Sequence, residues 1–159
     1  MEEGTGNVAD YLADGKHKLS ILKLGDLALS LTEVVAAANQ EEYVWTDVKP
    51  ENFVRVLRGT NNDFEYVGVD VETMVKEGGT LSPQQCVTAE YCAPELAAAM
   101  AGGKEAMDRL HVTPKLDAWA LGMMLFYVFH PDHITYFWEK GLKNEEQVGR
   151  WHDDSVCIF

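Results

Sequence analysis

Residues 43–52 of the chain read YVWTDVKPEN, which is the most informative stretch of the sequence. Asp47, Lys49 and Asn52 place an acid, a cation and an amide on one short loop. A carboxylate can accept the proton of an attacking hydroxyl, an ammonium can neutralise charge on a transferring phosphoryl group, and an amide oxygen can bind Mg²⁺. Phosphoryl transfer to a hydroxyl requires these chemical types. Alone, the stretch also fits a solvated turn that contains Pro50 and ends a helix.

A helix and a β-hairpin are predicted on either side of this loop. Apolar residues recur at three- and four-residue intervals over residues 24–38, which is the stripe of a helix packed on a core, and Asn39 ends it. Residues 53–56 and 64–69 read as two strands. The segment between them, residues 58–63, is rich in residues that tolerate positive φ, so the strands are expected to pair as a hairpin.

Two more helices are predicted in the second half of the chain. Residues 71–85 are polar and have no clear period, which indicates a surface loop. A helix is expected over residues 94–100, because Pro94 suits the first helical position and Gly102 follows the segment. Residues 116–129 are apolar almost all round, as in a helix buried at the centre of a domain.

Composition limits the classes of fold and partner. A chain of 159 residues with 47% apolar residues predicts one globular domain with a sizeable core. The formal net charge of −13 argues against nucleic acid or a membrane surface as a partner. Cys86, Cys92 and Cys157 are odd in number and lack a C-x-x-C spacing, which indicates a reducing compartment such as the cytoplasm. The apolar residues 118–129 are too few to span a bilayer, and no targeting signal is expected at residues 1–20.

Three further motifs follow the loop in order. Residues 69–72 read VDVE, residues 88–95 read TAEYCAPE and residues 115–122 read KLDAWALG. A hairpin would bring Asn52 and Asp70 to the same end of the sheet, where their oxygens could share one metal ion. Each motif also has a simpler interpretation. Asp70 fits an aspartate in a turn, and residues 88–95 fit a turn before a helix that begins with proline. Asp117 fits an acid at a helix N-terminus, stabilised by the helix dipole.

Together these motifs resemble the C-terminal lobe of a eukaryotic protein kinase. Residues 47–52 match the catalytic loop, Asp70 the aspartate of D-F-G, residues 88–95 the T-x-E-Y-x-A-P-E end of the activation segment, and Asp117 the start of D-x-W-x-x-G. The resemblance implies a protein-kinase-like fold that is mainly α with a small β-hairpin. Residues 1–159 would form a partial kinase domain, the part that follows the hinge.

The resemblance also implies a role for each residue of the site. Asp47 would be the catalytic acid or base, and Lys49 the cation that faces the phosphates of ATP. Asn52 and Asp70 would bind the Mg²⁺ that accompanies ATP. Thr88 would orient Asp47 and Lys49. The Ser/Thr type is implied because Lys49 stands two residues after Asp47.

Two more residues are implied to support the structure. Glu95 would be a buried ion-pair partner. Asp117 would accept hydrogen bonds from the backbone around Trp45 and Thr46. A carboxylate at the start of so apolar a helix needs such partners, because burying it unpaired is costly.

The sequence departs from the family in the loop and after Asp70. Trp45 and Thr46 stand where the family has histidine and arginine, and Glu72 stands for the glycine of D-F-G. Glu72 either influences Mg²⁺ affinity or is a solvated loop residue, and the second interpretation is favoured. Because the arginine that usually pairs with an activation-loop phosphate is absent, we expect that phosphorylation of Thr73, Thr80 or Ser82 does not switch activity by that route.

The sequence also leaves part of a kinase unaccounted for. Residues 4–6 read GTG but lie too close to Asp47 to be a phosphate-covering loop, so they are expected to form a turn after the hinge. Residues 1–23 do not resemble an N-lobe, and the resemblance implies that the last helices of the lobe, with the arginine that pairs with Glu95, would follow Phe159. We therefore expect a truncated kinase fragment with little activity alone, whose partners are a protein substrate or docking partner and a missing N-lobe segment.

Two other functions remain open from the sequence. The first is a non-catalytic, pseudokinase-like scaffold or docking module with the same fold. The second is an unrelated acidic helical interaction domain, which would be favoured if Asp47, Asn52 and Asp70 did not converge in space.

Overall fold

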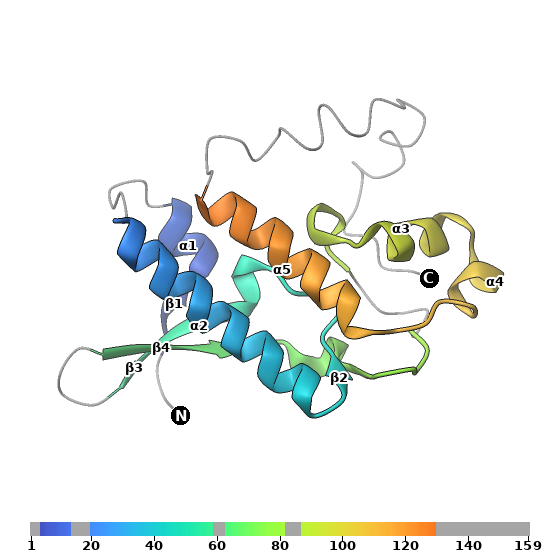
Figure 1. The fold of residues 1–159 in the computed structure, drawn as a ribbon, viewed down its shortest axis with the longest axis horizontal. Coiled ribbons are helices and arrows are strands. Elements are labelled where there is room, and N and C mark those ends of the chain that lie inside the picture. Colours follow the sequence, from blue (N-terminus) through green and yellow to red (C-terminus); the bar gives the residue numbers. More distant parts are fainter. Residues whose placement is uncertain (1–3, 14–19, 59–62, 82–86, 130–159) are drawn as a thin grey trace.

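The computed structural model describes residues 4–13, 20–58, 63–81 and 87–129. None of the helices in these ranges is long and apolar enough to cross a membrane. Figure 1 shows the elements in chain order: β1 (Gly4–Asn7), α1 (Val8–Ala13), α2 (Ile21–Gln40), β2 (Tyr43–Val44), β3 (Phe53–Arg58), β4 (Asp63–Gly68), β5 (Val75–Lys76), α3 (Pro94–Ala101), α4 (Lys104–Met107) and α5 (Pro114–Phe129). Short 3₁₀ turns occur at η1 (Pro50–Asn52), η2 (Val71–Thr73) and η3 (Ala89–Tyr91).

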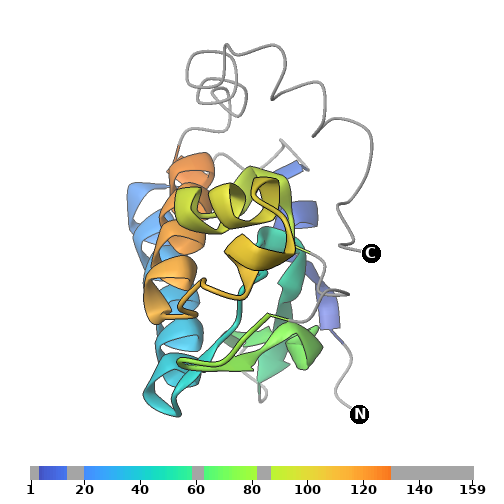
Figure 2. The ribbon, with the colours of Figure 1, turned by 90° about the vertical axis from the view of Figure 1, so that its right-hand side faces the viewer.

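Helices α2 and α5 lie side by side and carry the main core (Figures 1 and 2). The helix predicted over residues 24–38 is confirmed and begins earlier, at Ile21, because the Ser20 hydroxyl caps it by accepting the Lys23 N–H at 3.4 Å. Its apolar stripe packs inward and α5 supplies the facing side chains. The core consists of Val8, Leu27, Leu31, Val35, Trp45, Val48, Phe53, Ala120, Leu121, Met124 and Val128.

The predicted α5 is also confirmed, and it begins at Pro114. It is not buried all round, since Trp119 is 45% exposed and Gly122 is exposed as well. The helix therefore has one core face and one outer face, even though both are apolar in sequence. The predicted helix at Pro94 is confirmed as α3, which ends before Gly102.

The predicted hairpin is confirmed as β3 and β4, paired from Phe53 with Gly68 to Arg58 with Asp63. Its connecting residues, 59–62, lie outside the described residues. The turn expected at residues 4–6 is wrong, because this segment is strand β1, antiparallel to β3, in a sheet of order β1-β3-β4. The backbone N–H and C=O groups at the free edge of β3 favour such pairing, and glycine-rich residues give no sign of it in sequence.

The surface loop expected at residues 71–85 contains regular structure that the sequence did not indicate. Strand β5 pairs antiparallel with β2, Tyr43 opposite Lys76 and Val44 opposite Val75. The described residues thus form a mixed α/β domain with more sheet than a single hairpin. Strand β2 leads directly into residues 45–52, named here the Asp47 loop, so the small sheet fixes where that loop begins.

Candidate active site

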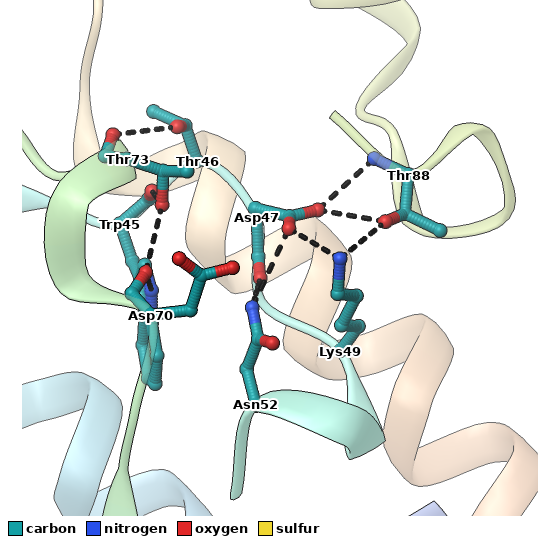
Figure 3. Close-up of polar contacts among 8 residues, drawn as sticks. All are labelled: Trp45, Thr46, Asp47, Lys49, Asn52, Asp70, Thr73 and Thr88. Atoms are coloured by element: carbon teal, nitrogen blue, oxygen red, sulfur yellow. Dashed lines mark hydrogen bonds and ion pairs between the residues drawn. The ribbon is translucent and has the colours of Figure 1, made fainter. Parts of the chain in front are cut away.

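The Asp47 carboxylate is the centre of a closed set of hydrogen bonds (Figure 3). Its Oδ1 accepts the Thr88 backbone N–H at 3.0 Å and the Thr88 hydroxyl at 2.8 Å. Its Oδ2 accepts the Lys49 Nζ at 2.6 Å and lies 3.4 Å from the Asn52 Nδ2. The side chain is only 4% exposed, so these donors compensate for the water that the carboxylate has lost.

Lys49 completes a triangle with Asp47 and Thr88. Its Nζ lies 3.0 Å from the Thr88 Oγ1, which accepts this hydrogen bond while it donates its own hydrogen to Asp47. Side-chain exposure is 21% for Lys49, against 4% for Asp47. The ammonium group can therefore face a ligand from solvent while the carboxylate stays sheltered.

Asn52 follows on η1, and its orientation is fixed by the loop itself. The amide Nδ2 donates to the backbone carbonyl of Asp47 at 2.9 Å. With the nitrogen committed to the loop, Oδ1 is the atom left to accept a cation. The Asn52 backbone carbonyl accepts the Val69 N–H at 2.9 Å, which continues the hairpin ladder toward Asp70.

Asp70 lies at the same end of the hairpin as Asn52, as the sequence predicted. In Figure 3 its carboxylate points toward Asp47 and Asn52. The residue has φ 58° and ψ 47°, a left-handed conformation that is uncommon for a residue with a side chain. Its carbonyl accepts the Trp45 indole N–H at 3.3 Å. Asp70, which comes from a separate motif, thus lies close to the acid and the amide of the Asp47 loop.

These oxygens suit a hard cation that also binds phosphate. Among the described residues, no group of three or more histidine, cysteine, aspartate or glutamate side chains is placed to hold a metal ion. A cation at Asn52 and Asp70 would therefore need oxygens from its own ligand, and Mg²⁺ in proteins is commonly held by one or two carboxylates together with substrate phosphates. Glu72 is exposed on η2, as expected for a solvated residue.

Asp117 fixes the start of the Asp47 loop by hydrogen bonds to its backbone. It is fully buried in the first turn of α5. Its Oδ1 accepts the Thr46 N–H and its Oδ2 accepts the Trp45 N–H, both at 2.8 Å, which are the bonds that the kinase resemblance implied. Burial raises the pKa of Asp117 above its ordinary value, and hydrogen bonds from Trp45, Thr46 and Asn39 offset part of this rise.

Glu95 does not join this assembly, and its expected burial is wrong. The residue is exposed in the first turn of α3 and forms no hydrogen bond or ion pair with the described residues. Its neighbour Leu96 is buried together with Ala99 on the core face of the helix. Because successive helical residues turn by about 100° at 3.6 residues per turn, Glu95 faces away from that core.

Three residues that build the site were missed as site residues in the sequence. Asn39 lies in the last turn of α2, and its Nδ2 lies 2.8 Å from the Asp117 Oδ2 and 2.9 Å from the Tyr43 carbonyl. The Trp45 indole N–H donates to the Asp70 carbonyl, and the Thr73 hydroxyl donates to the Trp45 carbonyl in the Asp47 loop. The available signal was a tryptophan inside a polar loop, because a buried indole N–H needs an acceptor.

Known proteins similar to this chain include protein kinases. No protein-family model matches the sequence. Mouse protein-tyrosine kinase 6 is 29% identical over 142 residues, which covers 89% of this chain and 28% of that protein. The human protein-tyrosine kinase 6 is 25% identical over 142 residues, with the same shares of the two chains. Mouse dual specificity protein kinase TTK is 29% identical over 100 residues, which covers 62% of this chain and 11% of that protein.

The fold gives a separate comparison. A chain from the crystal structure of the yeast RNA Pol II CTD kinase CTDK-1 complex superposes with a TM-score of 0.63 at 17% identity, over 80% of this chain and 38% of that chain. In the sequence comparisons, the chain spans 28% of the length of the two tyrosine kinase relatives. These comparisons make the chain a distant homologue of protein kinases that shares their fold.

Proposed function

We propose that Asp47, Lys49, Asn52 and Asp70 form the catalytic-loop side of an ATP-dependent protein kinase centre. The acceptor is the hydroxyl of a serine or threonine in a protein substrate. The observation that carries this proposal is the closed triangle of Asp47, Lys49 and Thr88, with Lys49 bonded to both partners at 2.6 and 3.0 Å. An isolated turn has no reason to bury a carboxylate and surround it with an ammonium, a hydroxyl and an amide.

Each side chain has a task in the proposed reaction. Asp47 orients the attacking hydroxyl and accepts its proton. Lys49, which is more exposed than Asp47, meets negative charge on the transferring phosphoryl group. Asn52 and Asp70 would hold Mg²⁺, which would neutralise charge on the ATP phosphates when bound. Thr88 holds Asp47 and Lys49 at fixed separation, so the acid and the cation act on one transferred group.

The choice of a serine or threonine acceptor rests on Lys49. The similar proteins are named as a tyrosine kinase and a dual specificity kinase, so acceptor choice needs a direct assay. Peptides that differ only in carrying Ser, Thr or Tyr should be compared as substrates of the same preparation. Transfer to Ser and Thr peptides, absent in Asp47→Asn, supports the proposal, and transfer to the Tyr peptide alone contradicts the acceptor class.

A binding function without transfer is the second candidate. It is favoured by Trp45, Thr46 and Glu72, which replace three residues of the kinase pattern. In that case the lobe would bind nucleotide or a docking partner and would phosphorylate nothing. The acidic helical interaction domain considered above has lost its support, because Asp47, Asn52 and Asp70 converge.

Calorimetric titration of the full chain with ATP, with and without Mg²⁺, tests the shared part of both kinase-like functions. Asp70→Asn keeps the size of the side chain and removes its charge. Glu72→Gln makes the same change two residues away on an exposed side chain, so it is the matched control. Mg²⁺-dependent binding in wild type and Glu72→Gln, lost in Asp70→Asn, is the expected result. Equal binding in all three proteins, or no binding by wild type, contradicts the proposal.

A further inference from the structure

Two threonines join the Asp47 loop to the segment after Asp70 by crossed hydrogen bonds (Figure 3). The Thr46 hydroxyl donates to the Thr73 carbonyl at 3.0 Å. The Thr73 hydroxyl donates to the Trp45 carbonyl, also at 3.0 Å, and lies 3.3 Å from the Asp70 carbonyl. A hydroxyl has one hydrogen to donate, so the shorter contact to Trp45 is the main bond. Each threonine thus binds the backbone of the other segment.

The Trp45 side chain adds a third connection between the same two segments. Its indole N–H donates to the Asp70 carbonyl at 3.3 Å. The ring is fully buried, lies 5.2 Å from the Phe53 ring between centroids, and fills the space above Gly68, where a Cβ would stand 2.5 Å from its Cη2. The indole is therefore a fixed donor, and the Asp70 carbonyl is held where that donor points.

These bonds hold two residues in unfavourable backbone conformations. Thr46 has φ 68° and Asp70 has φ 58°. A β-branched residue is rarely found at positive φ, and such conformations persist only where the surrounding contacts enforce them. The Thr46 N–H bond to Asp117 fixes one side of the residue, and its hydroxyl bond to Thr73 fixes the other.

We propose that Thr46, Thr73 and Trp45 act as positioning residues that keep the Asp70 carboxylate directed at Asp47 and Asn52. This inference rests on the proposed function and names the groups that prepare its cation site. The arrangement is complete with unmodified threonine hydroxyls, so Asp70 needs no phosphate on the following segment to reach its place. A phosphate on Thr73 would have the opposite effect, because it replaces the hydrogen that Thr73 donates to Trp45.

Paired valine and serine variants test this inference in the full chain. Thr46→Val and Thr73→Val keep the branched shape and remove the donor, whereas Thr46→Ser and Thr73→Ser keep the donor. The valine variants should bind Mg²⁺·ATP about threefold to tenfold more weakly than wild type, as expected for one lost hydrogen bond, and the serine variants should bind nearly as wild type does. Valine and serine variants that bind alike would overturn the inference.

Two measurements without nucleotide separate this inference from the proposed function. The Met74 N–H, just after η2, donates to the Val71 carbonyl at 3.0 Å, so its hydrogen exchange reports on the segment after Asp70. Exchange should be about tenfold faster in the valine variants, and the Trp45 indole N–H resonance, assigned with Trp45→Phe, should shift. If wild type binds no Mg²⁺·ATP, the proposed function fails while these two signals still decide the inference. If Thr46→Val does not fold, Thr73→Val, whose φ is not positive, decides it.

Discussion

The Asp117 carboxylate, in the first turn of α5, accepts the backbone N–H of Thr46 at 2.8 Å and so fixes the peptide group that precedes Asp47. In Asp117→Asn, an NH₂ group replaces one of the two carboxylate oxygens. This group cannot accept a hydrogen bond, so at least one donor that bonds Asp117 loses its acceptor. We expect Asp117→Asn to lower the free energy of unfolding by about 1–3 kcal/mol, the usual cost of an unsatisfied buried polar group. Urea unfolding of the two proteins measures this difference.

Asp108→Asn is the control for that change. Asp108 pairs with Lys104 at 2.7 Å on the surface of α4, where both side chains are largely exposed. An exposed pair of this kind contributes little, so the control should change stability by less than about 0.5 kcal/mol. If both variants are equally stable, Asp117 does not hold the Asp47 loop.

Gly68 and Gly25 should respond oppositely to alanine. A Cβ at Gly68 would lie 2.5 Å from Trp45 Cη2 and 3.3 Å from Val34 Cγ1, and the Trp45 ring is fully buried. Gly68→Ala should therefore destabilise the protein by about 1–3 kcal/mol. Gly25 is an exposed residue of α2 with nothing within 4 Å of its Cβ position, so Gly25→Ala should stabilise by about 0.5–1 kcal/mol. Thermal unfolding measures both, and a stable Gly68→Ala would mean that Trp45 can move.

Cys92 should be slow to alkylate in the folded protein. Burial, and to a smaller extent Glu95, raises the pKa of Cys92 from 9.0 to about 12. At pH 8 the thiolate fraction is then about a thousandfold lower in the folded than in the unfolded chain. Iodoacetamide should modify Cys92 correspondingly slowly in a Cys86→Ser, Cys157→Ser protein, compared with the same protein in urea. Similar rates in both states would show that the thiol is accessible.

The same pKa gives a pH dependence of stability. Because the folded pKa lies above the unfolded value of 9.0, the folded chain keeps the Cys92 proton where the unfolded chain releases it. The contribution of the protonated Cys92 thiol to the free energy of unfolding is complete below pH 9 and is lost as the pH rises toward 12. Replacing Cys92 by Ala should remove this part of the alkaline loss of stability, as measured by urea unfolding across that range.

Phosphate-like charge should have different effects at Thr73 and Thr80. Thr80 is exposed, and residue 46 is a threonine that offers no cation to a phosphate. Thr80→Glu should therefore leave Mg²⁺·ATP affinity unchanged, whereas Thr73→Glu should weaken it because the donor to Trp45 is lost. A gain in affinity with either variant would contradict the expectation drawn from the sequence, and a gain with Thr73→Glu would also contradict the role assigned to Thr73.

Local patterns made much of this fold predictable. The helices α2, α3 and α5 follow from apolar periodicity and from Pro94, and the β3–β4 hairpin follows from two apolar segments around a polar turn. Strands β1, β2 and β5 were not predictable, because they are short and form only through pairing with residues far away in sequence. Glu95 was misplaced because the family role was carried over without the partner that would bury it.

The site was predictable where its residues are close in sequence. Asp47, Lys49 and Asn52 are neighbours, and the hairpin register brings Asp70 to them. The bonds from Thr46 to Thr73 and from Trp45 to Asp70 depend on how two segments dock, and no pattern within either segment signals them. The positive φ of Thr46 was equally hidden, since β-branched residues avoid that region, and nothing in the sequence marks Asp70 as one of the aspartates that adopt it.

Paramagnetic broadening by Mn²⁺ tests the proposal that Asn52 and Asp70 hold the cation that accompanies ATP. With ATP present and Mn²⁺ well below the protein concentration, the side-chain amide resonances of Asn52 should broaden first, because broadening falls steeply with distance. The Asn39 amide, bonded instead to Asp117 and the Tyr43 carbonyl, is the internal control. The Asn52 signal should be lost early in wild type and retained in Asp70→Asn. Equal broadening of Asn39 and Asn52, or the same Asn52 broadening in Asp70→Asn, would contradict it.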